Sequence, residues 1–195
     1  MEDHIPKAIP SSLQEMLRNA FATGAVSEIH NNFYQAVNDD TEPFDQGNGV
    51  GGLPFVNFPD KKISSKSALV ISNSCDTSDA NEQDISARCT YCAVRTLASL
   101  RTMLLEKAKI SEKKVNKLID DIKSQRVSDM MYIPRGSGMT EESVAMLSFV
   151  MSADAEAVEA THKPTIVFTL SQNALYLLLT KLSIHFLRFG EIKYS

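Results

Sequence analysis

The chain has 195 residues and a formal net charge of −4, with 43% hydrophobic and 23% charged residues. This balance excludes a chain that is disordered over most of its length, because it provides enough apolar surface for a core without disulfide staples. The most apolar stretch, residues 174–187, contains Lys181 and His185, which excludes a membrane-spanning segment. Because Met1–His4 is acidic and no apolar run follows it, we expect a cytoplasmic protein without a membrane partner.

Residues 1–40 are predicted to form an N-terminal helical segment. Ser11 or Ser12 is placed to cap a helix, and apolar side chains follow at helical spacing as far as Val37. Residues 41–54 come next and are rich in Asn, Asp, Gly and Pro, which is typical of a flexible loop. The packed domain is therefore expected to comprise residues 55–195.

This domain is predicted to open with three strands. Their expected bounds are Leu53–Phe58, Lys66–Ser72 and Ala87–Thr96. The second contains a continuous apolar run, Ala68–Ile71, which is typical of a strand buried on both faces. A polar turn separates the second strand from the third, so the two should pair as an antiparallel hairpin.

Helices and strands follow in the remainder of the chain. Leucines and isoleucines at helical spacing predict two helices, 97–110 and 111–125, as a helical insertion over residues 97–126. Further strands are predicted at Met130–Pro134, 143–151 and Thr165–Leu170. Residues 143–151 also fit a helix, and we choose the strand. A long C-terminal helix should begin after Ser171 and end near Phe189.

The chain has three cysteines, Cys75, Cys89 and Cys92, and an odd number argues against a disulfide framework. Cys89 and Cys92 have zinc-ligand spacing, and Cys75 and His185 would complete a tetrahedral site. In a regular strand, however, side chains three residues apart point to opposite faces, which favours buried free thiols. We expect no cofactor, with zinc as the alternative.

The polar turn after the buried strand is a candidate binding surface. Ser72, Asn73 and Asp76 would be held by the strand end and exposed by the turn. The same side chains are also typical of turns in which they bond the backbone. Cys75 would need a neighbouring base to act as a nucleophile, and no histidine is close to it in sequence.

The predicted helical insertion is basic in an acidic protein. Residues 101–126 carry eight bases and four acids, and Lys113, Lys114 and Lys117 are their densest group. Such a segment is either a solvated helix face or a contact surface for an acidic partner. No aromatic residue is interleaved with the lysines, so a protein partner is favoured over a nucleic acid.

Two short motifs carry a family resemblance. The strand Ser67–Asn73 and the returning segment Ala93–Thr96 resemble the SH3-like barrel of the MazF/PemK toxin family. The Ser72-x-x-Cys75-Asp76 ending resembles uncharacterised bacterial and phage proteins with the same motif. The toxin resemblance implies an endoribonuclease, for which Arg88, Arg95 and Thr96 are the candidate catalytic residues. Ser67 stands where the toxins have an arginine.

We therefore expect an α+β protein. Its core would be a small, bent, SH3-like antiparallel barrel or sheet with N-terminal helices, the helical insertion and a long C-terminal helix. The expected function is that of a non-catalytic binding or regulatory protein of a bacterial or phage defence, counter-defence or toxin–antitoxin system. The alternatives are a toxin-like endoribonuclease and a zinc-stabilised interaction module. The methionines and the apolar last helix also suggest a homodimer.

Overall fold

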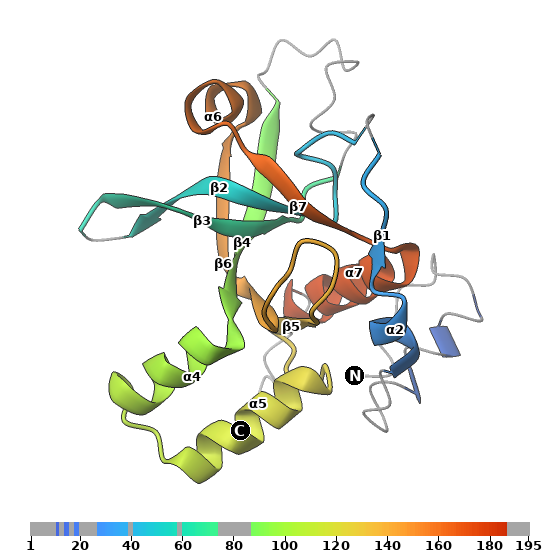
Figure 1. Ribbon diagram of the computed structural model, residues 1–195, viewed down its shortest axis with the longest axis vertical. Coiled ribbons are helices and arrows are strands. Elements are labelled where there is room, and N and C mark those ends of the chain that lie inside the picture. Colours follow the sequence, from blue (N-terminus) through green and yellow to red (C-terminus); the bar gives the residue numbers. More distant parts are fainter. Residues whose placement is uncertain are drawn as a thin grey trace, which may run out of the picture.

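The structure is a computed structural model. It describes residues 27–38, 41–57, 60–73 and 87–186, together with positions 11, 14, 15, 18 and 19. Within this part of the chain, helices surround a single curled antiparallel sheet that resembles half of a barrel (Figure 1). The predicted α+β class is therefore confirmed.

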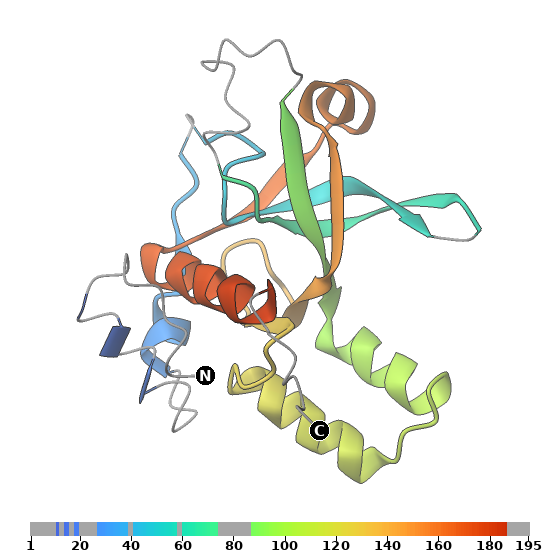
Figure 2. The same ribbon diagram turned by 180° about the vertical axis from the view of Figure 1, so that it is seen from behind.

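Seven strands form the sheet in the described part of the chain, in the order β1-β7-β2-β3-β4-β6-β5. Their bounds are β1 Tyr34–Gln35, β2 Asn48–Asn57, β3 Lys62–Val70, β4 Arg88–Thr96, β5 Met130–Ile133, β6 Ser143–Asp154 and β7 Thr165–Leu170. Every neighbouring pair is antiparallel. The outer parts of β2 and β3 extend as a two-stranded arm, seen in both views (Figures 1 and 2).

The predicted strands are confirmed with small shifts at their ends. The run Ala68–Val70 pairs with β4, where Ala68 lies opposite Ala93, Leu69 opposite Cys92 and Val70 opposite Tyr91. The ambiguous segment 143–151 is strand, as chosen, and belongs to β6. Alternating apolar side chains on both faces explain why a helix pattern fitted it equally well.

Part of the predicted loop 41–54 is wrong, because Asn48–Pro54 belongs to β2. Glycine is required there for close packing rather than for flexibility. A Cβ at Gly49 would lie 2.0 Å from Cε1 of Phe168 on β7. Gly47 and Gly52 have φ near +90°, which side chains rarely adopt, and Gly52 lies at the irregularity in the β2–β3 pairing.

The predicted N-terminal helical segment is also wrong at its end. Helix α2 covers only Ser27–Asn31, and the chain then enters the sheet as β1. Tyr34 pairs with Leu170, and its side chain packs against Phe33 and Phe168. The apolar period as far as Val37 therefore reflects burial of Phe33 beside a strand, while Val37 itself is exposed.

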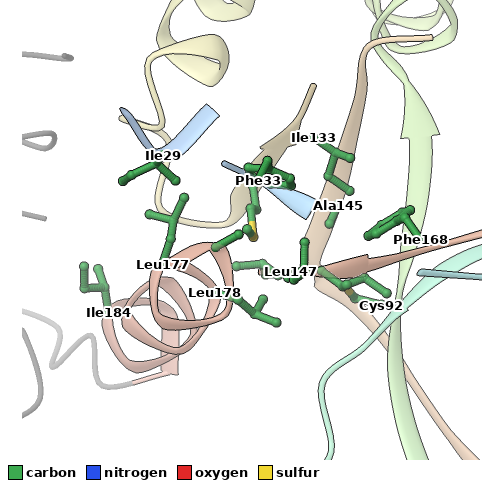
Figure 3. Packing of buried hydrophobic residues seen from close by; sticks show 14 residues of the cluster. Ile29, Phe33, Cys92, Ile133, Ala145, Leu147, Phe168, Leu177, Leu178 and Ile184 are labelled. Carbon is green, nitrogen blue, oxygen red and sulfur yellow. The ribbon is translucent and has the colours of Figure 1, made fainter. Parts of the chain in front are cut away.

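The sheet is buried on both faces, as the run Ala68–Ile71 predicts. One face carries Leu69 and Cys92 and is covered by α7 (Gln172–Phe186) and α2 (Figure 3). The other face carries Ala68, Val70 and Cys89 and is partly covered by α6 (Ala155–His162). Helix α6 begins at Asp154, whose side chain accepts a hydrogen bond from the Ala157 N–H group at 2.8 Å.

The helical insertion forms two helices, α4 (Leu97–Glu106) and α5 (Glu112–Lys123). They project from the sheet as a hairpin, which both views show (Figures 1 and 2). Leu97, Leu100 and Ile122 bury its root against Tyr132 and Val144 of the sheet. The far end of the hairpin thus extends from a packed base.

Helix α7 begins as expected from Ser171, whose Oγ accepts a hydrogen bond from the Ala174 N–H group at 3.3 Å. Its predicted end near Phe189 lies outside the described residues. Within the described residues, no helix combines the length and the hydropathy needed to cross a membrane.

Candidate functional site

The two described cysteines do not converge on a metal. Both are free and buried, but Cys89 lies in the core on one face of the sheet and Cys92 in the core on the other. Cys75 lies outside the described residues, and His185 packs against Phe186 on α7. Among the residues that the structure describes, no three His, Cys, Asp or Glu side chains gather as a metal would require. The strand alternation places Cys89 and Cys92 on opposite faces of the sheet, which does not favour a zinc ion shared between them.

Burial also keeps both thiols protonated. It raises the pKa of Cys89 to about 11 and that of Cys92 to about 12. Nucleophilic attack needs the thiolate, so neither described cysteine is suited to act as a nucleophile.

Ser72 begins the turn predicted as a binding surface, and it forms hydrogen bonds with Thr90 of β4. The Ser72 N–H group donates to the carbonyl oxygen of Thr90, and the Thr90 N–H group donates to Ser72 Oγ, each at 3.1 Å. Asn73 is exposed, and Asp76 lies outside the described residues. Ser72 thus holds the end of β3 against β4, which is the backbone-bonding alternative for this turn.

The candidate ribonuclease residues lie at the two ends of β4. Thr96 caps α4, where its Oγ1 accepts a hydrogen bond from the Ser99 N–H group at 3.1 Å. The Arg95 guanidinium contacts Sδ of Met103 at 3.2 Å, whereas Arg88 donates to Ser152. Arg88 and Arg95 are seven positions apart along the strand, or about 23 Å. The structure thus places Arg95 and Thr96 at one end of β4 and Arg88 at the other, and the ribonuclease assignment stays a prediction.

The basic end of the hairpin has an exposed cationic face, although Val115 within it is buried. We call it the lysine tip; it comprises the last loop-facing turn of α4, the connection and the first half of α5. Its exposed cations are Lys107, Lys109, Lys113, Lys114 and Lys117. Among the described residues, none of them forms an ion pair, whereas Glu112 of the same segment is neutralised by Arg101 at 2.6 Å. Within the described residues, the lysine tip contains five lysines against two carboxylates, Glu106 and Glu112, so it presents an excess of positive charge.

A polar hollow lies at the root of the hairpin. It has a volume of about 380 Å³ and is lined by Tyr132 of β5, Arg135 of the following turn and Glu142 before β6. The Tyr132 hydroxyl donates to one carboxylate oxygen of Glu142 at 2.6 Å, and Nζ of Lys123 donates to the other at 2.8 Å. The Glu142 carbonyl oxygen accepts the Leu97 N–H group at 2.9 Å, so Glu142 joins both helices to the sheet.

The charge states of this hollow follow from its hydrogen bonds. Those from Lys123 and Tyr132 lower the pKa of Glu142 from its usual range, so the carboxylate is ionised at neutral pH. Burial and the hydrogen bond to Glu142 raise the pKa of Tyr132, so its hydroxyl stays neutral and donates. Arg135 acts on both groups through its charge, although it forms no hydrogen bond with either.

The residues behind the hollow fix its shape. Gln125 is completely buried with φ +57°, and its side chain bonds both the N–H group and the carbonyl oxygen of Tyr132. The His30 ring packs against the Tyr132 ring at a tilt of 59°, with 5.0 Å between centroids, and its buried Nε2 has no hydrogen-bond partner in the described structure. Tyr132 is thus held on both sides.

A buried lysine supports the same region from α7. Nζ of Lys181 donates to the carbonyl oxygens of Gln125, Val127 and Met130, each at 2.8 Å. Burial lowers the pKa of Lys181 to about 7, while Asp129 opposes that shift. Three accepting carbonyls need three N–H donors, so this geometry holds the ammonium form.

None of the hollow's residues was identified from the sequence. Lys123 and Glu142 are 19 positions apart, and no spacing rule connects them. The available signals were weaker: a lysine within the apolar helix at Lys181, and the Arg135-Gly136-Ser137-Gly138 turn, which the sequence does predict.

The comparisons with known proteins give no relative for this chain. No protein-family model matches the sequence, and no curated protein matches it either. Its function is therefore argued from its own residues.

Proposed function

We propose that this protein is a non-catalytic binding protein whose contact element is the lysine tip of the α4–α5 hairpin. The single observation that carries the proposal is the five exposed lysines of the tip, which have no ion pair among the described residues. They project from the sheet on a hairpin with a packed root (Figure 2). An unpaired group of like charges costs folding energy through mutual repulsion, which a partner of opposite charge removes.

The partner fits the chemistry of an acidic protein surface better than that of a nucleic acid. Residues 97–126 contain no aromatic side chain, so the hairpin offers no platform on which bases could stack. Lys113 and Lys117 are one helical turn apart and share a face of α5. Carboxylates on a facing helix or strand match this spacing.

Binding is favoured over catalysis because the candidate ribonuclease residues have separate structural tasks. Arg88 and Thr96 bond to their neighbours at opposite ends of β4. The proposal includes the bacterial or phage setting and the SH3-like kinship that the strand motifs imply. The curled antiparallel sheet supports that kinship at the level of architecture alone.

The test is affinity enrichment of the tagged full-length chain from its host cells, quantified by mass spectrometry. The hairpin variant carries Lys113→Glu, Lys114→Glu and Lys117→Glu. The matched control carries the same change at Lys61, Lys62 and Lys163, which are exposed lysines outside the hairpin.

We expect a protein partner that the wild type and the control recover equally. The hairpin variant should recover about tenfold less of it, since opposed charges at an interface repel. Circular dichroism checks that all three proteins are folded. Equal recovery by the hairpin variant would exclude the lysine tip as the contact element.

A further inference from the structure

The lining of the polar hollow at the root of the hairpin contains one cation, Arg135, and one carboxylate, Glu142. Lys123 is not part of the lining, but its ion pair with Glu142 places a second positive charge beside the hollow. Lys123 binds Glu142 at 2.8 Å, so the carboxylate is already paired. Arg135 is left without a hydrogen bond or an ion pair among the described residues.

Most of the free donors in and beside the hollow belong to Arg135 and Lys123, while the oxygens of Glu142 keep some capacity to accept. The guanidinium of Arg135 has five N–H groups, and the ammonium of Lys123 has two beyond the one given to Glu142. The Tyr132 hydroxyl gives its proton to Glu142. A ligand that completes this site must therefore supply acceptors, and the planar fork of arginine matches phosphate and carboxylate oxygens.

The turn that carries Arg135 is held against the sheet, so the hollow exists before any ligand arrives. Gly136 and Met139 exchange backbone hydrogen bonds at 3.1 and 2.9 Å, and the Gly138 N–H group donates to the carbonyl oxygen of Val167 at 3.1 Å. The Tyr34 hydroxyl bonds the carbonyl oxygen of Pro134. A preformed site loses less entropy on binding than one that must be ordered.

We propose that this hollow binds a small molecule through an anionic group, a phosphate or a carboxylate, that pairs with Arg135 beside Lys123. The volume of about 380 Å³ is near the lower end of the range for ligand pockets, which favours a small metabolite over a large cofactor. Glu142 faces the same space and accepts a hydroxyl or amino group of the ligand. This site is distinct from the lysine tip and goes beyond the proposed function.

The experiment titrates the full-length protein with two probes, inorganic phosphate and, separately, succinate. Amide NMR spectra follow each titration up to about 50 mM, with ionic strength held constant by potassium chloride so that screening does not change. The variants are Arg135→Gln and Arg135→Lys. Arg101→Gln removes one positive charge from the hairpin, away from the hollow, and is the matched control.

Saturable shifts in the amides around Tyr132 and Arg135 with either probe support the site. The probe that binds more tightly identifies phosphate or carboxylate as the preferred group. We expect Arg135→Gln to weaken binding about tenfold, Arg135→Lys to weaken it less, and Arg101→Gln to leave it unchanged. The proposal is overturned if neither probe saturates, or if Arg135→Gln binds as the wild type does.

Discussion

His30 is half-buried, and its buried Nε2 has no partner in the described structure. Its ring lies between Phe33 and Tyr132, at centroid distances of 6.2 and 5.0 Å. Burial lowers the pKa of His30 below the usual value of 6.5. The folded protein therefore keeps this imidazole neutral at a pH where the unfolded chain binds a proton.

This difference predicts a pH-dependent stability. As the pH falls below about 6.5, the unfolded chain takes up a proton that the folded chain refuses, so stability decreases until the pH reaches the folded pKa. His30→Phe should remove this loss, because phenylalanine suits the aromatic contacts and does not titrate. Urea denaturation at pH 7.5 and pH 5.5 measures the effect. Parallel losses of stability in the wild type and in His30→Phe would contradict this account.

Lys181 shows how one charged side chain can secure a segment of backbone. Its three hydrogen bonds satisfy carbonyl oxygens of the connection between α5 and β5. Lys181→Met should leave these carbonyls without a donor and cost about 3 kcal/mol of stability or more. Denaturant midpoints give the change, and Lys117→Met, at an exposed position on α5, is the control. A Lys181→Met protein as stable as the control would show that the bonds contribute little.

The turn between β5 and β6 depends on Gly138. A Cβ at this position would lie 2.2 Å from the carbonyl oxygen of Val167, which also accepts the Gly138 N–H group. Gly138→Ala should therefore displace the turn from β7 and cost about 2 kcal/mol. Gly51→Ala is the matched control, since its nearest neighbour, Oγ1 of Thr165, would be 3.3 Å from the added Cβ. Equal thermal midpoints for the two variants would show that the turn is not held as described.

For single helices and strands, the sequence predicts the type of element well, but it fails where tertiary packing determines which structure a segment adopts. The run Ala68–Ile71 identifies a strand buried on both faces because its apolar pattern is local. The glycines of β2 suggest a loop, since nothing in the local sequence reveals that the Phe168 ring fills the space beside Gly49. The sequence does not predict helix α6 or strand β1 for a different reason: both are too short to give a periodic apolar pattern.

The candidate site was less predictable than the fold. The lysines of the hairpin lie close together in the sequence, so their positive charge can be recognised without the structure. The hollow instead joins the end of α5, the end of β5 and the start of β6, and its charges meet only after the hairpin packs on the sheet. The cysteine spacing misled because strand geometry places Cys89 and Cys92 in different cores.

The sheet separates two hydrophobic cores, one on each face, and each core contains one described cysteine. This separation predicts whether the stability effects of the two cysteines are independent. Cys89→Ala and Cys92→Ala should each destabilise the protein by removing buried atoms. Because they lie in cores on opposite faces, their effects should add to within about 0.5 kcal/mol. A double-mutant cycle in denaturant measures the coupling, and a chelator should leave the midpoints unchanged. Strong coupling that a chelator abolishes would restore the shared zinc site.

The molecule also separates its charges: the net charge is −4, while the lysine tip lies on the hairpin that projects from the sheet (Figure 1) and carries five lysines that form no ion pair with the described part of the chain. The most direct test of the central claim is the equilibrium affinity of the recovered partner for the wild type, the hairpin variant and the control variant, at low and high salt. We expect the affinity to fall with salt, the hairpin variant to bind about tenfold more weakly, and the control to bind as the wild type does. An affinity that is independent of salt and equal in all three proteins would contradict the central claim.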